Sequence, residues 1–236
     1  MKEIKILHLY SRLLSLYGEY GNADYLAKVL TDNGHAVTLD KAESIPADLS
    51  GYDLVYTGAG TEADVMVAAE DIKQGGAADY IAKGGLWLAT GNSMALLGGE
   101  IKYGTLTAKG LGAVNFATKM SREKRWLGDA LTDGSNLFGE QIIGYVNSSS
   151  VYEGIEDGLL NFVLGAGLGN DKVGGGDGFA YNGVIATQLT GPLLVKNPAV
   201  LKFFYEKLAG DDLEIEADHP QQMAYDNALK QLSARI

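Results

Sequence analysis

The feature that most restricts the fold of this chain is the alternation of short apolar segments and helical patterns in its first hundred residues. Each apolar segment has the length of a buried strand and is too short for a core helix. One helical pattern ends at Asn33-Gly34, a typical C-terminal signal. This repetition predicts an α/β fold with a mostly parallel, doubly wound sheet and helices on both faces. The predicted strands are residues 4–9, 37–39, 54–56 and 86–89.

The second half of the chain follows a different pattern. Residues 104–157 contain short strand patterns and turns, which predict irregular or antiparallel strands along one side of the sheet. Residues 165–178 contain seven glycines but no lysine-tipped phosphate-loop spacing, so we interpret them as a plain loop. A strand, a turn at Asn182-Gly183 and a second strand are expected over 179–189. A helix is expected from residue 197 to about residue 208.

We predict one domain over residues 1–210, followed by an acidic linker and a helix over 211–236 that packs on the domain or on a partner. A chain of 236 residues with 46% hydrophobic content can bury one substantial core. Met223, Leu229 and Leu232 are the apolar residues through which the last helix is expected to dock.

Composition excludes several classes of function. A net charge of −11 argues against nucleic acid and anionic membrane surfaces as partners. No apolar stretch approaches the roughly 20 residues that span a bilayer, so we expect a soluble, cytoplasmic protein without membrane insertion. The chain has no cysteine, hence no disulfide, thiolate metal site or cysteine nucleophile. The scattered His8, His35 and His219 predict no metal site, and no cofactor is predicted.

The stretch from Gly84 to Gly98 combines a predicted strand with a sharp turn. The strand breaks at Thr90-Gly91-Asn92, and an apolar helical stripe follows over 94–97. Many α/β enzymes present a nucleophile on such a strand-to-helix turn. Here the tip of the turn is Gly91, which has no side chain. The scaffold for a nucleophile is therefore predicted without the nucleophile.

Four short stretches, taken in their order and spacing, carry a family resemblance. They are 17–22 (YGEYGN), 58–62 (GAGTE), 85–98 and 188–192 (QLTGP). Together they resemble the class I glutamine amidotransferase-like proteins of the cobyric acid synthase type, in particular the glutaminase subunits of lipid II isoglutaminyl synthases, which are cell-wall enzymes. The resemblance covers nearly the whole chain. It implies a flavodoxin-like three-layer fold and a Mur-ligase-like partner.

The resemblance also implies where the catalytic residues would lie. The nucleophile motif of the family reads roughly Cys-Gly-Gly-aromatic-Gln-x-Leu-Gly, and its cysteine aligns with Gly91. The family histidine, which precedes Gly-Pro, aligns with Thr190. The turn Gly58-Ala59-Gly60 would supply backbone N–H donors to an oxyanion hole. A glutamine amidotransferase-like fold without glutaminase activity is implied.

Two charged residues have two interpretations each. Arg125 aligns with a family arginine near the glutamine pocket and would bind a small carboxylate ligand; alternatively it is a surface arginine paired with Glu123 or Asp129. Glu19 aligns with a family acid near the partner interface; alternatively it interacts favourably with the N-terminus of a helix. Residues 147–150 (NSSS) replace residues like Glu-Asn-His-Gly in the family.

A hydrolase is the rival interpretation of the same turn. Residues 91–95 (GNSMA) fit a relaxed G-x-S-x-G motif with Ser93 as nucleophile and His8, His35 or His219 as base. The alternative is that the Ser93 hydroxyl serves exposed backbone N–H groups in the first helical turn.

The sequence thus predicts a degenerate amidotransferase-like protein that acts as a non-catalytic subunit or regulator of a Mur-ligase-like complex in cell-wall metabolism. The alternatives are a hydrolase that uses Ser93 and a stand-alone amino-acid-binding protein. Restoring both lost side chains, by Gly91→Cys and Thr190→His, is expected from the sequence to give weak glutaminase activity.

Overall fold

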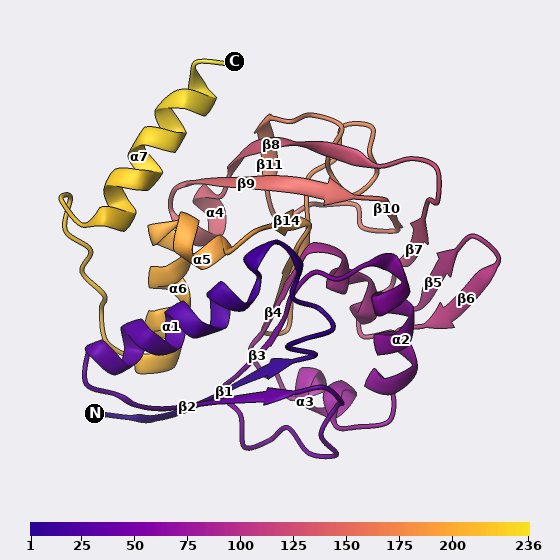
Figure 1. The fold of residues 1–236 in the computed structure, drawn as a ribbon, viewed down its shortest axis with the longest axis horizontal. Coiled ribbons are helices and arrows are strands. Elements are labelled where there is room, and N and C mark those ends of the chain that lie inside the picture. The colour runs from indigo at the N-terminus through magenta and orange to yellow at the C-terminus, as the bar shows by residue number, and fades with distance from the viewer.

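A six-stranded central sheet forms the middle of the protein, which we describe from a computed structural model covering Met1–Ile236 (Figure 1). Its strands are β1 (Glu3–Leu9), β2 (Ala36–Ala42), β3 (Leu54–Thr57), β4 (Trp87–Thr90), β12 (Phe179–Tyr181) and β13 (Val184–Thr187). They lie in the order β12-β13-β4-β3-β1-β2, and only the β12–β13 hairpin is antiparallel. The chain runs from β1 to β2 on one side and returns to β3 on the other. In such sheets ligands bind at the carboxyl ends of the strands near this reversal.

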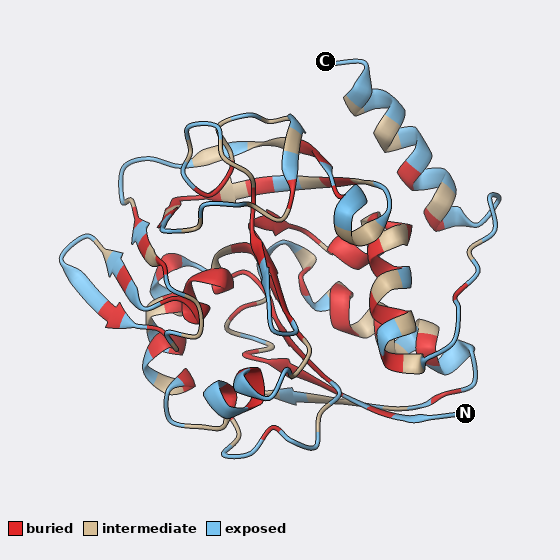
Figure 2. Cartoon of the chain, turned by 180° about the vertical axis from the view of Figure 1, so that it is seen from behind, coloured by how far each residue is buried: buried red, intermediate tan, exposed pale blue.

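Helices cover both faces of the central sheet. Because side chains alternate along a strand, Ile6 and Tyr56 face one side and Leu7 and Val55 the other. The first side packs against α1 (Tyr20–Asp32) and α6 (Pro198–Ala209), and the second against α2 (Glu62–Ile72) and α3 (Ala77–Ala82). Figure 2 shows the middle of the sheet as buried, and strands β3, β4 and β13 are buried along their whole length, whereas the edge strand β2 is not. The predicted α/β class is confirmed, and the arrangement is consistent with three layers.

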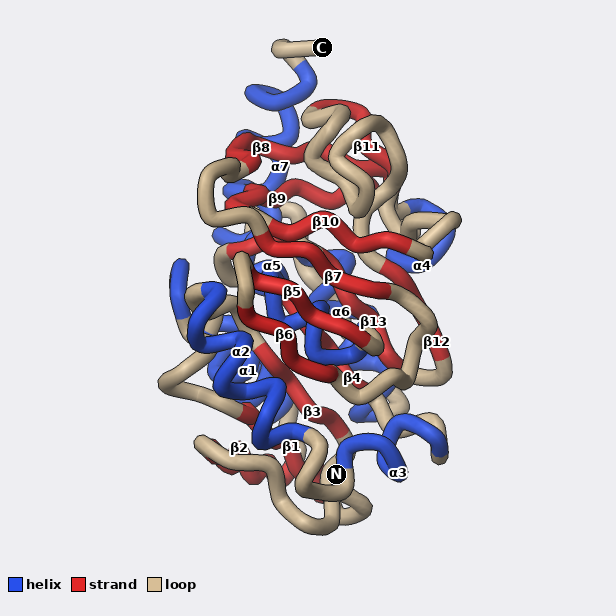
Figure 3. Tube along the Cα trace, turned by 90° about the vertical axis from the view of Figure 1, so that its right-hand side faces the viewer, coloured by secondary structure: helices blue, strands red, loops and turns tan.

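Two smaller four-stranded sheets are built from the second half of the chain. One contains β5 (Glu100–Tyr103), β6 (Leu106–Lys109), β7 (Ala117–Met120) and β10 (Ser150–Glu153); the other contains β8 (Trp126–Asp133), β9 (Gln141–Ser148), β11 (Asn161–Leu164) and β14 (Leu189–Thr190). All their strand pairs are antiparallel except β5–β7. In Figure 3, β8, β9 and β11 lie at one end of the molecule and β1 and β2 at the other. The predicted short strands of this region are present.

The remaining helices are mostly short. They are the 3-10 helices η1 (Leu16–Gly18) and η2 (Gly91–Leu97), and the α-helices α4 (Ser135–Phe138), α5 (Leu193–Lys196) and α7 (Pro220–Ser233). Helix α1 ends at Asn33-Gly34 as predicted, with Gly34 at a φ of +85°. No helix combines the length and the apolar character needed to cross a bilayer.

The predicted apolar helix over 94–97 is instead the last part of η2, a 3-10 helix in which every residue except Asn92 is buried. Helix η2 ends at Leu97, because backbone N–H groups of later residues donate to its last carbonyl groups. The amide groups of Leu111 and Val114 donate to the carbonyls of Leu96 and Leu97. This segment therefore carries the chain from the end of β4 through the core and leads directly to β5.

The last helix, α7, packs on β8 and β9 through a face that contains two of the three predicted residues. Met223 is 51% exposed, whereas Tyr225 is buried against Leu131 and Ile143. Leu229 and Leu232 are half-buried in the same cluster, as expected. The prediction for Met223 was wrong because a helical stripe through Leu229 and Leu232 continues one turn back to Tyr225.

Candidate functional site

The implied cysteine and histidine positions lie next to one another in the fold. Gly91 follows β4 directly, and Thr190 ends β14. A Cβ atom built on Gly91 lies 3.1 Å from Cγ2 of Thr190 and 2.5 Å from Cβ of Ala59. Gly91 has a φ of +64°, in the left-handed region that glycine adopts most easily. The turn after β4 thus has the left-handed backbone at its tip that is typical of a nucleophile-bearing turn, and glycine adopts it without strain.

Neither position carries a group for nucleophilic catalysis. Gly91 has no side chain, and the Thr190 hydroxyl donates a hydrogen bond to the carbonyl of Tyr145 at 2.9 Å. A threonine hydroxyl does not replace imidazole as a general base at neutral pH. A thiol is also absent everywhere else, because the chain has no cysteine.

The space for a nucleophile beside Gly91 is filled. Non-bonded carbon atoms normally stay about 3.5 Å or more apart, so the 2.5 Å between a Cβ on Gly91 and the Ala59 methyl is a clash. Ala59 itself is buried, in the turn after β3. Any side chain at position 91 therefore requires Ala59 to move or to lose its methyl group.

The resemblance implied that the turn Gly58-Ala59-Gly60 offers backbone N–H donors to an oxyanion. One of these donors, the N–H of Gly60, already has an acceptor inside the protein. The Gly60 N–H donates to Oδ1 of Asn92 at 3.0 Å, and Nδ2 of Asn92 donates back to the Gly60 carbonyl at 2.7 Å. Cβ atoms on Gly58 and Gly60 would each lie 2.5 Å from an atom of Leu14. The turn is thus packed under the β1–α1 connection, and the side chain of Asn92 is hydrogen-bonded to both the N–H and the carbonyl of Gly60.

Ser93 is fully buried, and its hydroxyl does not meet a histidine. The Ser93 Oγ lies 2.9 Å from the carbonyl of Thr90 and 3.1 Å from the carbonyl of Thr57, to which it donates. The sequence analysis interpreted this hydroxyl as an acceptor for exposed N–H groups. That interpretation was wrong, because the hydroxyl donates to carbonyl groups. Its contacts connect the ends of β3 and β4.

The three histidines are each placed elsewhere. Neither ring nitrogen of His8 has a hydrogen-bond partner, and burial lowers the pKa of its imidazole to about 4. His35 Nε2 lies 3.2 Å from the hydroxyl of Tyr205, and His219 Nδ1 caps α7 by accepting from the N–H of Gln221. Because a serine hydrolase needs a base hydrogen-bonded to its nucleophile, the geometry does not favour Ser93 as a catalytic residue.

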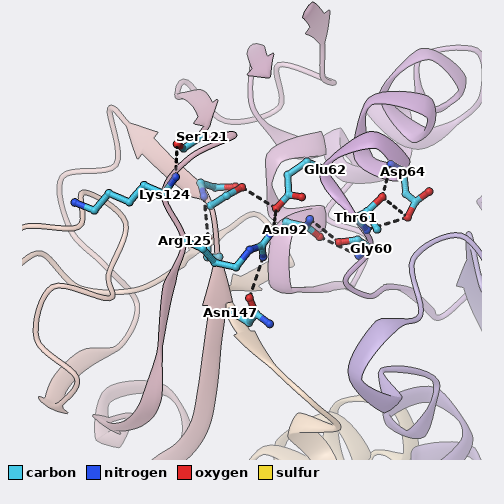
Figure 4. Close-up of polar contacts among 12 residues, drawn as sticks. Gly60, Thr61, Glu62, Asp64, Asn92, Ser121, Lys124, Arg125 and Asn147 are labelled. Atoms are coloured by element: carbon cyan, nitrogen blue, oxygen red, sulfur yellow. Dashed lines mark hydrogen bonds and ion pairs between the residues drawn. The ribbon is translucent and has the colours of Figure 1, made fainter. Parts of the chain in front are cut away.

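Arg125 is paired with a residue that the sequence analysis did not single out. Its Nη2 lies 2.5 Å from Oε1 of Glu62, and its Nη1 donates to Oδ1 of Asn147 at 2.9 Å (Figure 4). Neither Glu123 nor Asp129 is its partner. Asp129 pairs with Arg235 instead. The guanidinium of Arg125 is thus neutralised by a carboxylate of the same chain.

Glu19 lies inside the protein and connects four segments. Its Oε1 accepts from the Gly191 N–H at 2.7 Å, and its Oε2 accepts from the hydroxyls of Tyr56, at 2.7 Å, and Thr90. Burial raises the pKa of this carboxyl to about 7, although the hydrogen bonds from Thr90, Tyr56 and Gly191 lower it. With no exposed surface, the Glu19 side chain does not contact a partner directly. It lies at the start of α1 but makes no side-chain cap there.

None of four cavities of about 470 to 800 Å³ in the protein is lined by Gly91, Ser93, Arg125 or Thr190. Gly91, Ser93 and Thr190 are themselves buried. Small-molecule sites are usually concave and largely pre-formed. The carboxyl edge of the sheet is therefore closed at these three residues.

Sequence reasoning missed Glu62 and Asn92, although both lie inside the matched stretches 58–62 and 85–98. An acid at the first position of a helix and an asparagine after a glycine have ordinary local explanations. The only available signal was their place in stretches already linked to a site. Their partners lie 63 and 32 residues away along the chain.

Two curated proteins are similar to this chain along most of its length, whereas no protein-family model matches it. Both are subunit GatD of the glutamine-hydrolyzing lipid II isoglutaminyl synthase. The protein from Streptococcus pneumoniae is 27% identical over 225 residues, covering 91% of this chain and 85% of the relative. The protein from Staphylococcus aureus is 28% identical over 214 residues, covering 88% and 85%. The chain is thus a distant homologue of GatD over about nine-tenths of its length.

Proposed function

We propose that this protein is a non-catalytic subunit or regulator of a Mur-ligase-like amidating complex in peptidoglycan metabolism. The observation that carries the proposal is a closed site without thiol or imidazole in a chain that is similar almost end to end to a glutaminase subunit. Glutamine hydrolysis needs a nucleophile and a base, whereas assembly with a partner needs only a folded surface. A retained fold without the chemistry supports a role in assembly.

Exposed aromatic and aliphatic side chains gather beside the closed site. Nδ2 of Asn147 donates to the hydroxyl of Tyr17 at 2.9 Å. Asn147 lies opposite Leu127 in the β8–β9 pair, and Tyr145 shares its face of β9. Helix α1 begins close to Tyr17 with Tyr20 and Gly21. A Cβ atom built on Gly21 would lie 3.9 Å from Cγ2 of Val195, so Val195 lies beside the start of this helix. We define the aromatic surface as Tyr17, Tyr20, Leu127, Tyr145 and Val195, which are 37% to 55% exposed.

This aromatic surface is where we place the ligase-like partner. Tyrosine and other aromatic residues are enriched at protein interfaces, and a few such side chains usually carry most of the binding energy. The surface adjoins Thr190, whose hydroxyl donates to the backbone carbonyl of Tyr145. A partner bound here would cover the closed site.

The first test is purification of the protein from its source cell at its native level, with identification of what accompanies it. We expect a Mur-ligase-like ATP-binding protein in a fixed ratio and no glutamine hydrolysis that depends on this chain. Recovery of the chain alone would contradict the proposal.

Single substitutions on the aromatic surface are expected to weaken that complex. Tyr20→Ser and Leu127→Ser remove side chains that are both 55% exposed, so the fold should tolerate them. We expect each to lower the affinity about tenfold or more, the usual range for a buried interface residue. The measurement is titration of the two purified proteins.

Matched controls exist for both substitutions. Tyr181→Ser and Leu106→Ser remove similarly exposed side chains, 51% and 50%, from β12 and β6, which lie apart from β8 and β9 in Figure 3. They should leave the affinity unchanged. Equal loss in all four variants would show that the aromatic surface is not the interface.

A further inference from the structure

The outer face of the β8–β9 pair is covered at one end and open at the other. Residues directly opposite one another in this antiparallel pair share a face, and Leu131 lies opposite Ile143. Both are buried against Tyr225 of α7. Leu127 points to the same side, because it lies four residues before Leu131 on β8, but its side chain is 55% exposed. The aromatic surface therefore continues the sheet face that α7 covers.

A groove of about 470 Å³ lies where the cover by α7 ends. Helix α7 contributes Ala224 and Ala228 to its lining, and α5 contributes Val195. Val195 also belongs to the aromatic surface. Gly144, in the lining on β9, directly precedes Tyr145 of that surface. The groove and the aromatic surface are thus continuous.

Polar contacts fix α7 along its whole length. Near its start, Nε2 of Gln221 donates to the carbonyl of Leu194 at 2.7 Å. In the middle, the hydroxyl of Tyr225 donates to a backbone carbonyl of β9 at 2.7 Å, and after its last turn Arg235 pairs with Asp129. The position of α7 is therefore set within the chain itself, so the groove is pre-formed before any partner binds.

The groove carries one cation that has no carboxylate partner. Its charged lining residues are Asp129, Lys196 and Arg235. Arg235 pairs with Asp129, whereas Lys196 forms no ion pair. A Cβ built on Gly191 would lie 2.7 Å from Nζ of Lys196, so this ammonium group lies next to the residue that follows Thr190. The groove is complementary to an apolar side chain with a carboxylate beside it.

We propose that a helix of the ligase-like partner lies beside α7 on the β8–β9 face, inserts one apolar side chain into the groove and places a carboxylate against Lys196. This rests on the proposed subunit role and adds the chemistry of the partner to it. Two helices side by side would cover this face as α1 and α6 cover one side of the central sheet. Amphipathic helices commonly bind in apolar grooves through such anchors.

The test is titration of the Mur-ligase-like protein, recovered with the unaltered chain, into Ala224→Trp and Asn227→Trp. Both positions are exposed on α7, but only Ala224 lines the groove. Tryptophan at position 224 fills the groove, so we expect the affinity to fall about tenfold or more. Asn227→Trp, which adds the same side chain outside the groove, should leave the affinity unchanged.

The carboxylate of the partner is tested through Lys196→Gln. Loss of one exposed ion pair should slow association about two- to fivefold and reduce its dependence on salt. Lys230→Gln is the matched control, because Lys230 also lies in the last turn of a helix but does not line the groove. Equal association rates for Lys196→Gln and the unaltered protein would remove the carboxylate from the proposal.

A fluorescent label shows whether the groove itself is occupied. Because the chain has no cysteine, Ala224→Cys carries a single environment-sensitive fluorophore. Its emission should shift to shorter wavelength when the partner binds, whereas the same label on Asn227→Cys should not respond.

The proposal is overturned if the partner binds Ala224→Trp as tightly as the unaltered protein, or if both tryptophan variants lose affinity equally. A change in the oligomeric state of the chain alone in Ala224→Trp, measured by light scattering, would assign the groove to a second copy and also overturn it. If Tyr20→Ser and Leu127→Ser still weaken the complex, the subunit role survives that failure. If no complex forms at all, the subunit role and the groove proposal are rejected together.

Discussion

Restoring only the two implied catalytic side chains, by Gly91→Cys with Thr190→His, is expected to give no measurable ammonia from glutamine. The new Cβ at position 91 would lie 2.5 Å from that of Ala59, so the thiol is not placed correctly. The Gly60 N–H is also occupied by Asn92 and does not stabilise an oxyanion. From the structure we therefore expect no activity in the double variant, where the sequence predicted weak activity.

Adding Ala59→Gly and Asn92→Gly to the double variant is expected to produce slow glutamine hydrolysis. The first change removes the clashing methyl group, and the second frees the Gly60 N–H. One oxyanion donor contributes about 100-fold to the rate, so Asn92→Gly should have an effect of that order in the Ala59→Gly background. The assay is ammonia release at high glutamine concentration, because Arg125 is already paired with Glu62.

The matched control carries all these changes except Gly91→Cys and has to be inactive. Thermal unfolding of each variant shows whether the fold survives. If the double and quadruple variants hydrolyse glutamine equally fast, the filling of the site by Ala59 and Asn92 is not what limits catalysis.

The stability of the protein is expected to fall between pH 5 and pH 8 because of Glu19. The folded protein holds the pKa of this buried carboxyl at about 7, above the ordinary 4.5. Its contribution to the free energy of unfolding is therefore full below about pH 4.5 and is lost as the pH rises through 7. Since each pKa unit corresponds to about 1.4 kcal/mol, the loss is about 3 kcal/mol.

The measurement is chemical denaturation at several pH values of the unaltered protein and of Glu19→Gln. Glutamine does not titrate, can accept from the Gly191 N–H and can donate to the Thr90 hydroxyl. The difference between the two proteins also cancels His8, whose pKa near 4 acts in the opposite direction, since its contribution is lost as the pH falls from 6.5 to 4. Parallel curves for the two proteins would contradict the assignment.

Glu19→Ala should be less stable than Glu19→Gln at every pH. It leaves the Gly191 N–H buried without its acceptor, and an unsatisfied buried donor costs about 1–3 kcal/mol.

Local patterns were sufficient for most of the elements. The apolar segments that became β1, β3 and β4 are bounded by glycine or by charged residues, and such signals act within a few residues. The same reasoning failed for residues 94–97, because the partners of their carbonyls come from residues 111–114. It failed for Ser93 because a buried hydroxyl bonds whatever carbonyls the neighbouring strands present.

The sequence alone determined that this protein has no thiol nucleophile, that its fold alternates strands and helices, and that a glycine stands at the tip of the turn after β4. These properties depend on residue identity and local spacing. Only the tertiary structure decided that the site is closed. The contacts that close it, Ala59 beside Gly91, Asn92 on Gly60 and Glu62 on Arg125, join residues 32 or more positions apart. Which side chains meet across layers depends on how the sheets and helices pack, and no local pattern carries that information.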